Sequence, residues 1–401
     1  MPLFPALTLT APVVAVAAAA GALLVPSAVL CVESLSALLP RRAEPDRSGE
    51  RRPRMAILMP AHDEEAGIAK TVTALRAELA PGDRLLVIAD NCTDRTAERA
   101  REAGAEVAER TDPERRGKGF ALSFGANILR EDPPEVVLVM DADCRVEQGT
   151  LAELAKLAHR SGRPVQAVYL MHPPEREGLS SVSAFAFLVR NLVRPSGLKR
   201  LGMPCQLTGT GMAFPWELYR DAPATESFLV EDLLMGHELA LRGRAPILCD
   251  DVQVGSDFPT GEAASLKQRR RWEHGELSIL LGTAPRLLAK GLLRGEPGLV
   301  ALALDAAVPP LAFLVLLQGA TTAAGVTLAL VGGSSVPLVL SLGGAALLGV
   351  GLSAAWVAHG RDVLPLSDLA KIPRYVLWKL PLYATFLKKG AHSEWERTER
   401  T

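Results

Sequence analysis

Residues 136–143 read VVLVMDAD, an apolar run that leads directly into two aspartates, Asp141 and Asp143. A continuous apolar run of this length is typical of a strand buried on both faces of a parallel sheet. Further strands are expected at residues 55–61, 84–90, 105–108 and 167–171. Helical spacing is found at residues 67–79, 93–103, 118–129 and 150–159. This alternation predicts an α/β domain with a mostly parallel sheet that helices cover on both sides.

Polar residues follow three of these strands, at His62-Asp63-Glu64, at Asp90 and at Asp141-x-Asp143. In sheets of this kind ligands bind at the carboxyl ends of the strands. Two carboxylates at a strand end can supply oxygen ligands to Mg²⁺ or Mn²⁺, and a diphosphate can supply others. The alternative is a solvated strand end that caps the next helix. A Gly-rich dinucleotide fingerprint and a phosphate-binding Gly-Lys-Ser/Thr motif are both absent from the sequence, which disfavours nicotinamide-dependent oxidoreductases and P-loop enzymes.

Two further motifs lie beyond this region. Gln268-x-x-Arg271-Trp272 is rare by chance, although a basic helix with a tryptophan anchor at a membrane surface is an alternative. Glu231-Asp232 opens a run of helical spacing, where acids are also favoured by the helix dipole alone. Residues 206–211, QLTGTG, predict either a loop that a substrate approaches closely or a structural turn.

Charge and apolar residues are segregated along the 401-residue chain. The sequence is 48% hydrophobic with a formal net charge of −1, which gives no reason to expect nucleic-acid binding. Residues 11–31 are long enough to cross a bilayer, and the absence of a preceding basic region favours an uncleaved anchor over a signal peptide. The cysteines lie far apart without a Cys-x-x-Cys pair, which is typical of free thiols in a reducing compartment.

Two more spans are expected, at residues 299–331, with a tilt or a kink at Pro309-Pro310, and at 336–357. Basic residues cluster at 41–54 and again in the tail. With three spans in total, both clusters face the cytosol, as the positive-inside rule requires. Residues 372–389 mix aromatic residues with lysines, which suits a helix at the headgroup level. The prediction is a multi-pass protein of the cytoplasmic membrane with a cytosolic central domain.

The predicted organisation has six parts. They are an N-terminal transmembrane anchor (1–40), a basic linker (41–54), the α/β domain (55–262), interfacial helices with the QRRRW motif (263–298), two transmembrane helices (299–358) and a cytosolic basic, amphipathic tail (359–401).

Taken together, Asp90, Asp141-x-Asp143, Glu231-Asp232 and Gln268-x-x-Arg271-Trp272 resemble the motif set of family 2 glycosyltransferases with the GT-A fold. The resemblance is to the membrane-integrated branch that includes cellulose, chitin and hyaluronan synthases and ceramide glucosyltransferase. It covers roughly residues 55–272, and Trp395-x-Arg397-Thr398 in the tail also resembles bacterial members.

The resemblance implies roles for the donor-side residues. Asp90 would hold the nucleotide base, uracil by expectation, and Lys118 would contact a phosphate or the base. Asp141 would contact the nucleotide-sugar, and Asp143 would coordinate Mg²⁺ or Mn²⁺. The family's Tyr-Asn-Glu appears here as His62-Asp63-Glu64, a departure in which Glu64 still fits as a donor contact.

The resemblance also implies roles on the acceptor side. Asp232 would be the general base, with Glu231 beside it. Gln268, Arg271 and Trp272 would line the acceptor site and the diphosphate.

The function expected from these features is a membrane-bound, inverting, metal-dependent glycosyltransferase. It would move a sugar from a UDP-sugar to a lipid-linked or growing glycan acceptor, in contact with membrane lipids and other subunits of a polysaccharide assembly system. A processive polysaccharide synthase is an alternative. A second alternative belongs to another functional class: an inactive nucleotide-sugar-binding scaffold subunit of a polysaccharide export complex.

Overall fold

The computed structural model describes residues 11–41, 49–172, 179–222, 230–258 and 262–389. In it, the apolar runs of the sequence assemble into one eight-stranded sheet. The order of the strands in the sheet is β3-β2-β1-β4-β7-β6-β8-β5. Their bounds are β1 (Met55–Ala61), β2 (Arg84–Asp90), β3 (Glu106–Arg110), β4 (Val136–Val139), β5 (Arg145–Val146), β6 (Val165–His172), β7 (Met212–Pro215) and β8 (Ile247–Asp257).

The first half of the sheet is parallel, because β1 pairs in parallel with both β2 and β4, and β2 pairs in parallel with β3. The carboxyl ends of β1, β2 and β4 therefore meet at one edge. Strand β7 enters antiparallel between β4 and β6, so the second half is mixed. The expected α/β class with a mostly parallel sheet is confirmed.

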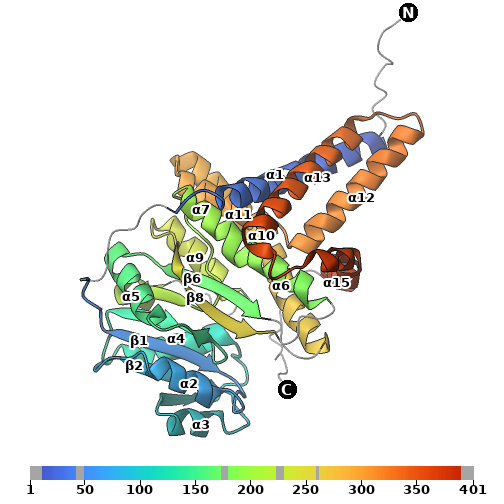
Figure 1. Ribbon diagram of the computed structural model, residues 1–401. Coiled ribbons are helices and arrows are strands. Elements are labelled where there is room, and N and C mark those ends of the chain that lie inside the picture. The colour runs from blue at the N-terminus through green and yellow to red at the C-terminus, as the bar shows by residue number, and fades with distance from the viewer. Residues whose placement is uncertain (1–10, 42–48, 173–178, 223–229, 259–261, 390–401) are drawn as a thin grey trace, which may run out of the picture.

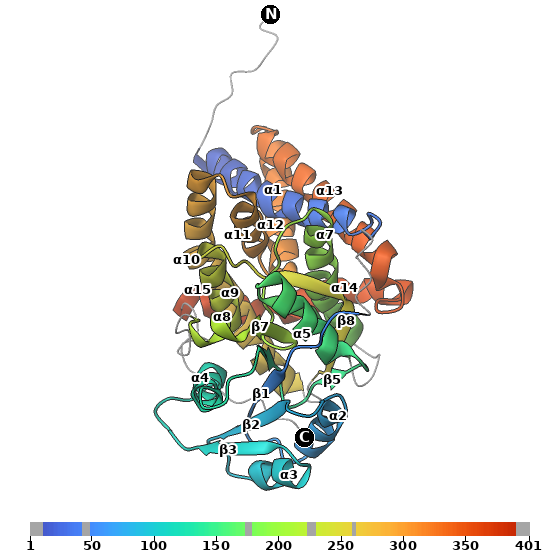
Figure 2. The ribbon, with the colours of Figure 1, turned by 90° about the vertical axis from the view of Figure 1, so that its left-hand side faces the viewer.

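Helices cover both faces of the sheet, as Figures 1 and 2 show. Alternate residues of β1 enter different cores. Ile57 packs with α2 (Ile68–Arg76) and α5 (Thr150–Ser161), whereas Leu58 packs with α4 (Lys118–Leu129). Burial on both faces explains why these strands are continuous apolar runs. The remaining helices of the domain are α3 (Thr96–Glu102), α6 (Ser180–Leu188), the π-helical η1 (Val189–Val193), α7 (Arg194–Arg200), α8 (Trp216–Arg220) and α9 (Glu231–Leu241).

Strand β8 was not expected, because its sequence ILCDDVQVGSD carries acids where a strand pattern would place apolar residues. The structure shows how the buried acid of this strand is neutralised. The buried carboxylate of Asp250 accepts hydrogen bonds from Lys199 and, at 3.0 Å, from Arg200, both on α7. A shift in the β6–β8 register, between Ala167 and Val168, accompanies this irregularity. A charge inside a strand is tolerated here because it is paired.

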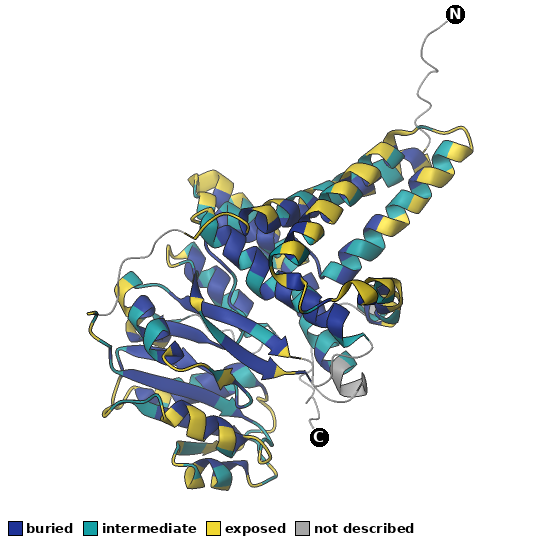
Figure 3. Cartoon of the chain, viewed as in Figure 1, coloured by how far each residue is buried: buried dark blue, intermediate teal, exposed yellow. Residues whose placement is uncertain are grey.

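Three helices are long and apolar enough to cross a membrane among the described residues: α1 (Ala11–Ser36), α12 (Leu311–Leu330) and α13 (Val336–Ala355) with its π-helical end η2 (Trp356–Gly360). They project together from the sheet domain (Figure 1) and much of their surface is exposed (Figure 3). A Cβ on Gly351 of α13 would lie 2.7 Å from the Leu30 side chain, so α1 and α13 approach closely. Apolar helices that pack on one side and expose the other suit a lipid environment.

The span expected at 299–331, with a tilt or kink at Pro309-Pro310, is shorter than expected, because the helix is interrupted before those prolines and the candidate span is α12 alone. The segment consists of α11 (Pro297–Ala306) and α12, separated by non-helical residues up to Pro310. The cause is Pro309-Pro310, because proline lacks the N–H of the helical ladder and disfavours helix at the residue before it. Helix α11 packs instead along α10 (Glu262–Arg294), where a Cβ on Gly291 would lie 2.9 Å from the backbone nitrogen of Val300.

The C-terminal tail forms η3 (Leu366–Lys371), which packs on α6. Two short helices follow, α14 (Ile372–Trp378) and α15 (Leu380–Lys389), in place of the one helix expected at 372–389, and they contact α10. Glu273 of α10 binds Lys379, and the Tyr383 hydroxyl donates to its other oxygen at 2.7 Å. Leu377 and Leu387 remain exposed, so one side of the tail is still suited to a membrane surface. The tail motif at residues 395–398 lies outside the described residues.

Candidate active site

The edge formed by β1, β2 and β4 carries the predicted donor-side residues. Glu64 follows β1, and its backbone N–H donates to the Thr96 hydroxyl at 2.7 Å, which ties this loop to α3. Asp90, at the end of β2, is only 6% exposed. Its Oδ1 accepts hydrogen bonds from Arg110 at 2.6 Å and from the Asn91 amide at 3.0 Å. Asp90 is therefore held as one fixed carboxylate at the sheet edge.

Lys118, the first residue of α4, connects the donor side to the loop at 206–211. Its Nζ donates to the Asp141 carboxylate and, at 2.6 Å, to the carbonyl of Gly209. The backbone N–H of Asp141 donates to the Thr210 hydroxyl at 3.0 Å. The loop therefore lies directly against the residues at the end of β4.

Asp232 lies against the same loop, close to Lys118. A Cβ built on Gly209 would be 3.3 Å from Asp232 Oδ2 and 3.6 Å from Lys118 Nζ. Gly209 also has φ of +89°, a conformation that side chains rarely adopt. Glycine is thus favoured for two reasons, its backbone angle and the close approach of the Asp232 carboxylate.

Glu231 and Asp232 are the first two residues of α9, where the helix dipole favours negative charge. Burial raises the pKa of Glu231 to about 7, with a further increase from the neighbouring Asp232 charge and an opposing effect of Lys118. Burial also raises the pKa of Asp232, against the attraction of Lys118. A carboxylate that binds protons more readily than usual is suited to accept one from a substrate.

Lys118 itself remains an ammonium group. Burial lowers its pKa, but the carboxylates of Asp141, Glu231 and Asp232 outweigh this effect and raise it. One cation therefore holds acids from two different elements in place.

Helix α10 brings the Gln-x-x-Arg-Trp residues to this site. The charge of Arg271 makes a small contribution that lowers the pKa of Glu231, against the larger effect of burial. Gln268 is buried at 3% exposure. Trp272 is partly buried, and its ring lies 5.8 Å from that of Phe187. Of the three, Arg271 is thus the one whose charge acts on Glu231, while Trp272 packs with aromatic residues.

Arg190 was missed by the sequence reasoning. It lies on η1, bonds Glu276 of α10 at 3.0 Å, and its charge lowers the pKa of Asp232. The available signal was an arginine inside the apolar run at 180–192, since arginine is seldom buried unless it is paired.

Oxygen ligands for a divalent cation lie at the end of β4. Asp141 is one-third exposed, and Asp143 is partly buried two residues further on. Hard carboxylate oxygens of this kind fit Mg²⁺ or Mn²⁺ together with phosphate oxygens. The donor set present therefore fits the expected metal.

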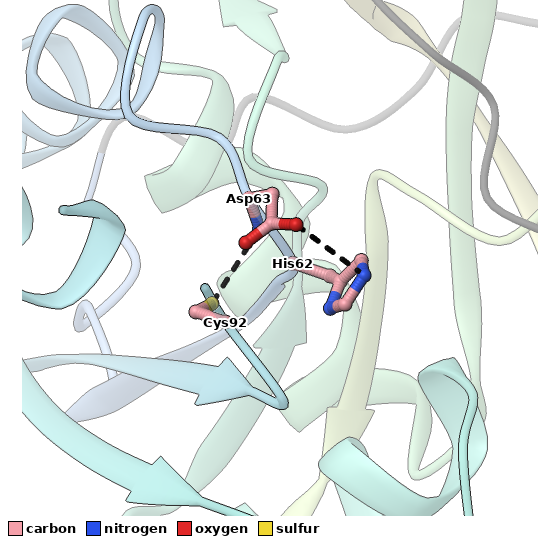
Figure 4. Close-up of side chains that lie close together, drawn as sticks. All are labelled: His62, Asp63 and Cys92. Carbon is pink, nitrogen blue, oxygen red and sulfur yellow. Dashed lines mark hydrogen bonds and ion pairs between the residues drawn. The ribbon is translucent and has the colours of Figure 1, made fainter. Parts of the chain in front are cut away.

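A second group of side chains, His62, Asp63 and Cys92, has ligand atoms within 4.8 Å of one another (Figure 4). These groups are engaged with the protein instead. Asp63 Oδ1 accepts the Thr93 N–H at 2.6 Å, and His62 Nδ1 lies 2.7 Å from the Asp90 carbonyl. Burial raises the pKa of the Cys92 thiol to about 11, which disfavours the thiolate that a metal would need. The cluster joins the loops that follow β1 and β2.

Replacing Gly209 by alanine tests the close approach at the site. In Gly209→Ala the new methyl group would lie 3.3 Å from Asp232 Oδ2 and would shift that carboxylate by a few tenths of an ångström, so we expect a loss of transfer activity that exceeds any loss of stability. Gly243→Ala is the matched control, because Gly243 also has a positive φ (+76°) but nothing within 4 Å of its Cβ position. Equal effects of the two substitutions on activity, normalised to thermal stability, would contradict the assigned contact.

Comparison with known proteins agrees with this geometry. A family model described as glycosyltransferase like family 2 matches residues 53–275. A low-salt glycan biosynthesis hexosyltransferase of Haloferax volcanii is 35% identical over 114 residues, which are 27% of this chain and 25% of that protein. The 4,4'-diaponeurosporenoate glycosyltransferase of Staphylococcus haemolyticus is 27% identical over 137 residues, 32% of this chain and 36% of that protein. The chain thus spans only about a quarter to a third of the length of these curated relatives.

Among solved structures, a mannosyltransferase from Pyrobaculum calidifontis, in complex with GDP-mannose and Mn²⁺, is similar with a TM-score of 0.57 and 20% identity. The similarity covers 86% of this chain and 97% of that one, so it includes helices outside the sheet domain. Since the family match spans more than half of the residues and the fold agrees, the chain belongs to the glycosyltransferase like family 2, with a GT-A-type fold.

Proposed function

We propose that this protein is an inverting, metal-dependent glycosyltransferase that moves one or a few sugars from a UDP-sugar to a lipid-linked acceptor at a membrane. The observation that carries the proposal is the position of Asp232. Its carboxylate lies against Gly209 and near Lys118, and Lys118 in turn holds Asp141. A base candidate and the lysine that binds a donor-side carboxylate thus both lie next to Gly209.

Each residue has a task in this reaction. The acceptor hydroxyl oxygen forms a bond to the anomeric carbon of the sugar, and the bond from that carbon to the diphosphate breaks. Asp232 takes the hydroxyl proton, and the diphosphate leaves with the bonding electrons. Lys118 and Arg271 supply positive charge near the leaving group. A cation bound at Asp141 and Asp143 would neutralise the diphosphate further.

Asp90 and Glu64 are proposed to bind the nucleoside of the donor. The carboxylate of Asp90 has one oxygen engaged by Arg110 and Asn91, so its other oxygen is the candidate acceptor for a base N–H. Uracil presents such an N–H. Gln268 and Trp272 are proposed to line the acceptor side, because both lie on α10 next to the membrane helices.

A single-transfer enzyme is favoured over a processive synthase by the membrane helices. A polymer of hydroxyl groups needs a polar channel, because each unpaired polar group costs several kcal/mol in an apolar medium. The candidate membrane helices α1, α12 and α13 are rich in Ala, Gly, Leu and Val. The idle-scaffold alternative is disfavoured by the presence of Asp232 and Lys118 next to Gly209, with Asp141 bound to Lys118.

The proposed topology has the N-terminus outside, and residues 41–298 and the tail in the cytosol. It predicts that a reporter fused after Gly333, between α12 and α13, reports the outer side, whereas a reporter fused at the C-terminus reports the cytosol. The basic residues at 41–54 and in the tail motivate this orientation. A C-terminal reporter on the outer side would overturn it.

Donor choice tests the proposed function directly. Purified protein is incubated with Mn²⁺ and a panel of UDP-, GDP- and dTDP-sugars, and the release of the nucleoside diphosphate is measured. We expect release from one or a few UDP-sugars, and dependence on the divalent cation. Selective release from GDP-sugars would refute the uracil assignment, and no release from any donor would favour the scaffold alternative.

A further inference from the structure

Strand β6 carries a buried polar side chain beside the loop at 206–211. Gln166, the second residue of the strand, is 2% exposed, and its neighbours Val165 and Ala167 are buried apolar residues. An amide that is removed from water is costly unless it is hydrogen-bonded. The strand expected from sequence at 167–171 began one residue after Gln166, so this amide was not considered there. Its partners show what it does.

The Gln166 amide binds the backbone of the loop on both sides of Gly209. Its Oε1 accepts the Thr208 N–H at 2.8 Å. Its Nε2 donates to the Thr210 carbonyl at 2.9 Å and to the Ala167 carbonyl at 2.9 Å. Since one partner is an N–H and the other two are carbonyls, the partners determine the orientation of the amide. One side chain thus holds the residue before Gly209 and the residue after it.

The segment that Gln166 holds makes three contacts of the candidate site. The Gly209 carbonyl accepts a hydrogen bond from Lys118, and a Cβ on Gly209 would lie 3.3 Å from Asp232 Oδ2. The Thr210 hydroxyl accepts the backbone N–H of Asp141 at 3.0 Å. A shift of this segment would therefore change the positions of donor-side groups relative to the proposed base.

Packing alone does not fix the loop at Thr208. A cavity of about 50 Å³ lies there, and Gln166, Thr208 and Leu233 are among the residues that line it. The Thr208 hydroxyl makes no hydrogen bond to the described residues. Side chains next to a void lose packing contacts on that side. The loop is held more directly at Gly211, whose carbonyl accepts the Ala167 N–H at 2.8 Å. The Gln166 amide therefore extends the hold of β6 from Gly211 back to Thr208.

We propose that Gln166 is a positioning residue for the transfer reaction. Its amide fixes the loop in the shape in which Gly209 binds Lys118 and lies next to Asp232. Gln166 acts through the loop backbone, and the charged side chains carry out the chemistry. Displacement of reacting groups by about 1 Å can reduce a rate about 100-fold, so a fixed loop matters for turnover. The inference rests on the proposed function, since it assigns a role in that reaction.

Gln166→Met tests the inference, because methionine keeps a side chain of similar length and removes all three hydrogen bonds. We expect kcat per donor-binding site to fall about 10- to 100-fold. The donor Kd should stay within a few-fold, because the side chains proposed to bind the nucleoside and the metal are unchanged. Calorimetry on the full-length protein gives the donor Kd and the number of binding sites on the preparation used for kcat. Partial unfolding lowers the number of sites, whereas a misplaced loop lowers kcat per site.

Hydrogen exchange reports on the loop without any reaction. Peptides that cover residues 206–212 should exchange faster in Gln166→Met than in wild type, because the Thr208 N–H loses its acceptor. Gln318→Met is the matched control. Gln318 is also a buried glutamine, 3% exposed, and its amide donates to the Ser341 carbonyl at 2.6 Å, but it lies on α12. It should leave both kcat per site and the exchange of the loop unchanged.

Three results would overturn the inference: unchanged kcat per site in Gln166→Met, an equal fall in Gln318→Met, or unchanged exchange of residues 206–212 in Gln166→Met. If Gln166→Met binds no donor, Gln166→Glu takes its place. Glutamate keeps the oxygen that accepts the Thr208 N–H and loses at least one of the two donated bonds, so kcat per site should fall as well, and an unchanged value would contradict the role. A wild-type protein that releases nucleotide from no donor rejects the proposed function, and the exchange of residues 206–212 still decides whether Gln166 holds the loop.

Discussion

Asp232→Asn is expected to reduce sugar transfer by about 10²–10⁴-fold, the usual contribution of a general base. Donor binding should stay within a few-fold of wild type, because Asp232 is not among the residues proposed to bind the metal or the nucleoside, and Lys118 keeps its hydrogen bonds to Asp141 and Gly209. The substitution keeps the shape of the side chain and removes a buried charge, so unfolding does not account for the loss. The check is to measure kcat by product formation and the donor Kd by calorimetry on the same preparation.

Glu238→Gln is the control for this variant. Glu238 lies on the same helix, α9, and its partly exposed carboxylate is 3.7 Å from Arg286. It should leave transfer almost unchanged, since ion pairs of this kind contribute little. Substantial turnover in Asp232→Asn would remove Asp232 from the role of base, and Glu231, with its pKa raised to about 7, would become the candidate.

Asp143→Ala is expected to abolish the dependence of donor binding on the divalent cation. Asp143 and Asp141 are the oxygen ligands proposed for the metal, and replacing groups that only support a ligand already weakens metal binding by about 10- to 100-fold. Loss of a direct ligand should weaken metal binding at least as much. Donor affinity is measured with and without Mn²⁺, and we expect the two values to converge in the variant.

Cys92→Ala is the informative control here, because Cys92 belongs to the other group of candidate ligands. If the metal site lies at Asp143, Cys92→Ala keeps the response to Mn²⁺. If instead Asp143→Ala keeps that response and Cys92→Ala loses it, the metal site lies between the loops after β1 and β2.

The parallel half of the sheet was predictable from sequence with accurate bounds. Strands β1 and β2 and helix α4 begin and end where the residue pattern indicated. Each is a run with one consistent pattern and clear boundaries. Strand β8 was missed because its buried Asp250 is compensated by α7, more than forty residues away in sequence. A pattern read within one segment carries no information about such a partner.

In the candidate site, too, the individual residues were predictable from sequence but their arrangement was not. The acids and Lys118 were identifiable one by one, from strand ends and from the family resemblance. Their arrangement around Gly209 was not, because the hydrogen bond from Lys118 to that carbonyl joins residues 91 positions apart. The packing of Lys379 and Tyr383 on Glu273 was hidden for a similar reason, with the partners 106 and 110 positions apart. Aromatic residues and lysines in the tail are equally compatible with a free helix on a membrane surface.

The most direct test of the account is transfer by purified protein in liposomes that contain a total lipid extract, with a labelled UDP-sugar identified from the donor panel. The account predicts a labelled product that partitions into organic solvent, carries one or a few sugars, and has the anomeric configuration opposite to that of the donor. A product that retains the donor configuration would contradict the use of Asp232 as a base in a single displacement. Long polymer inside the liposomes, made without another protein, would contradict the single-transfer function.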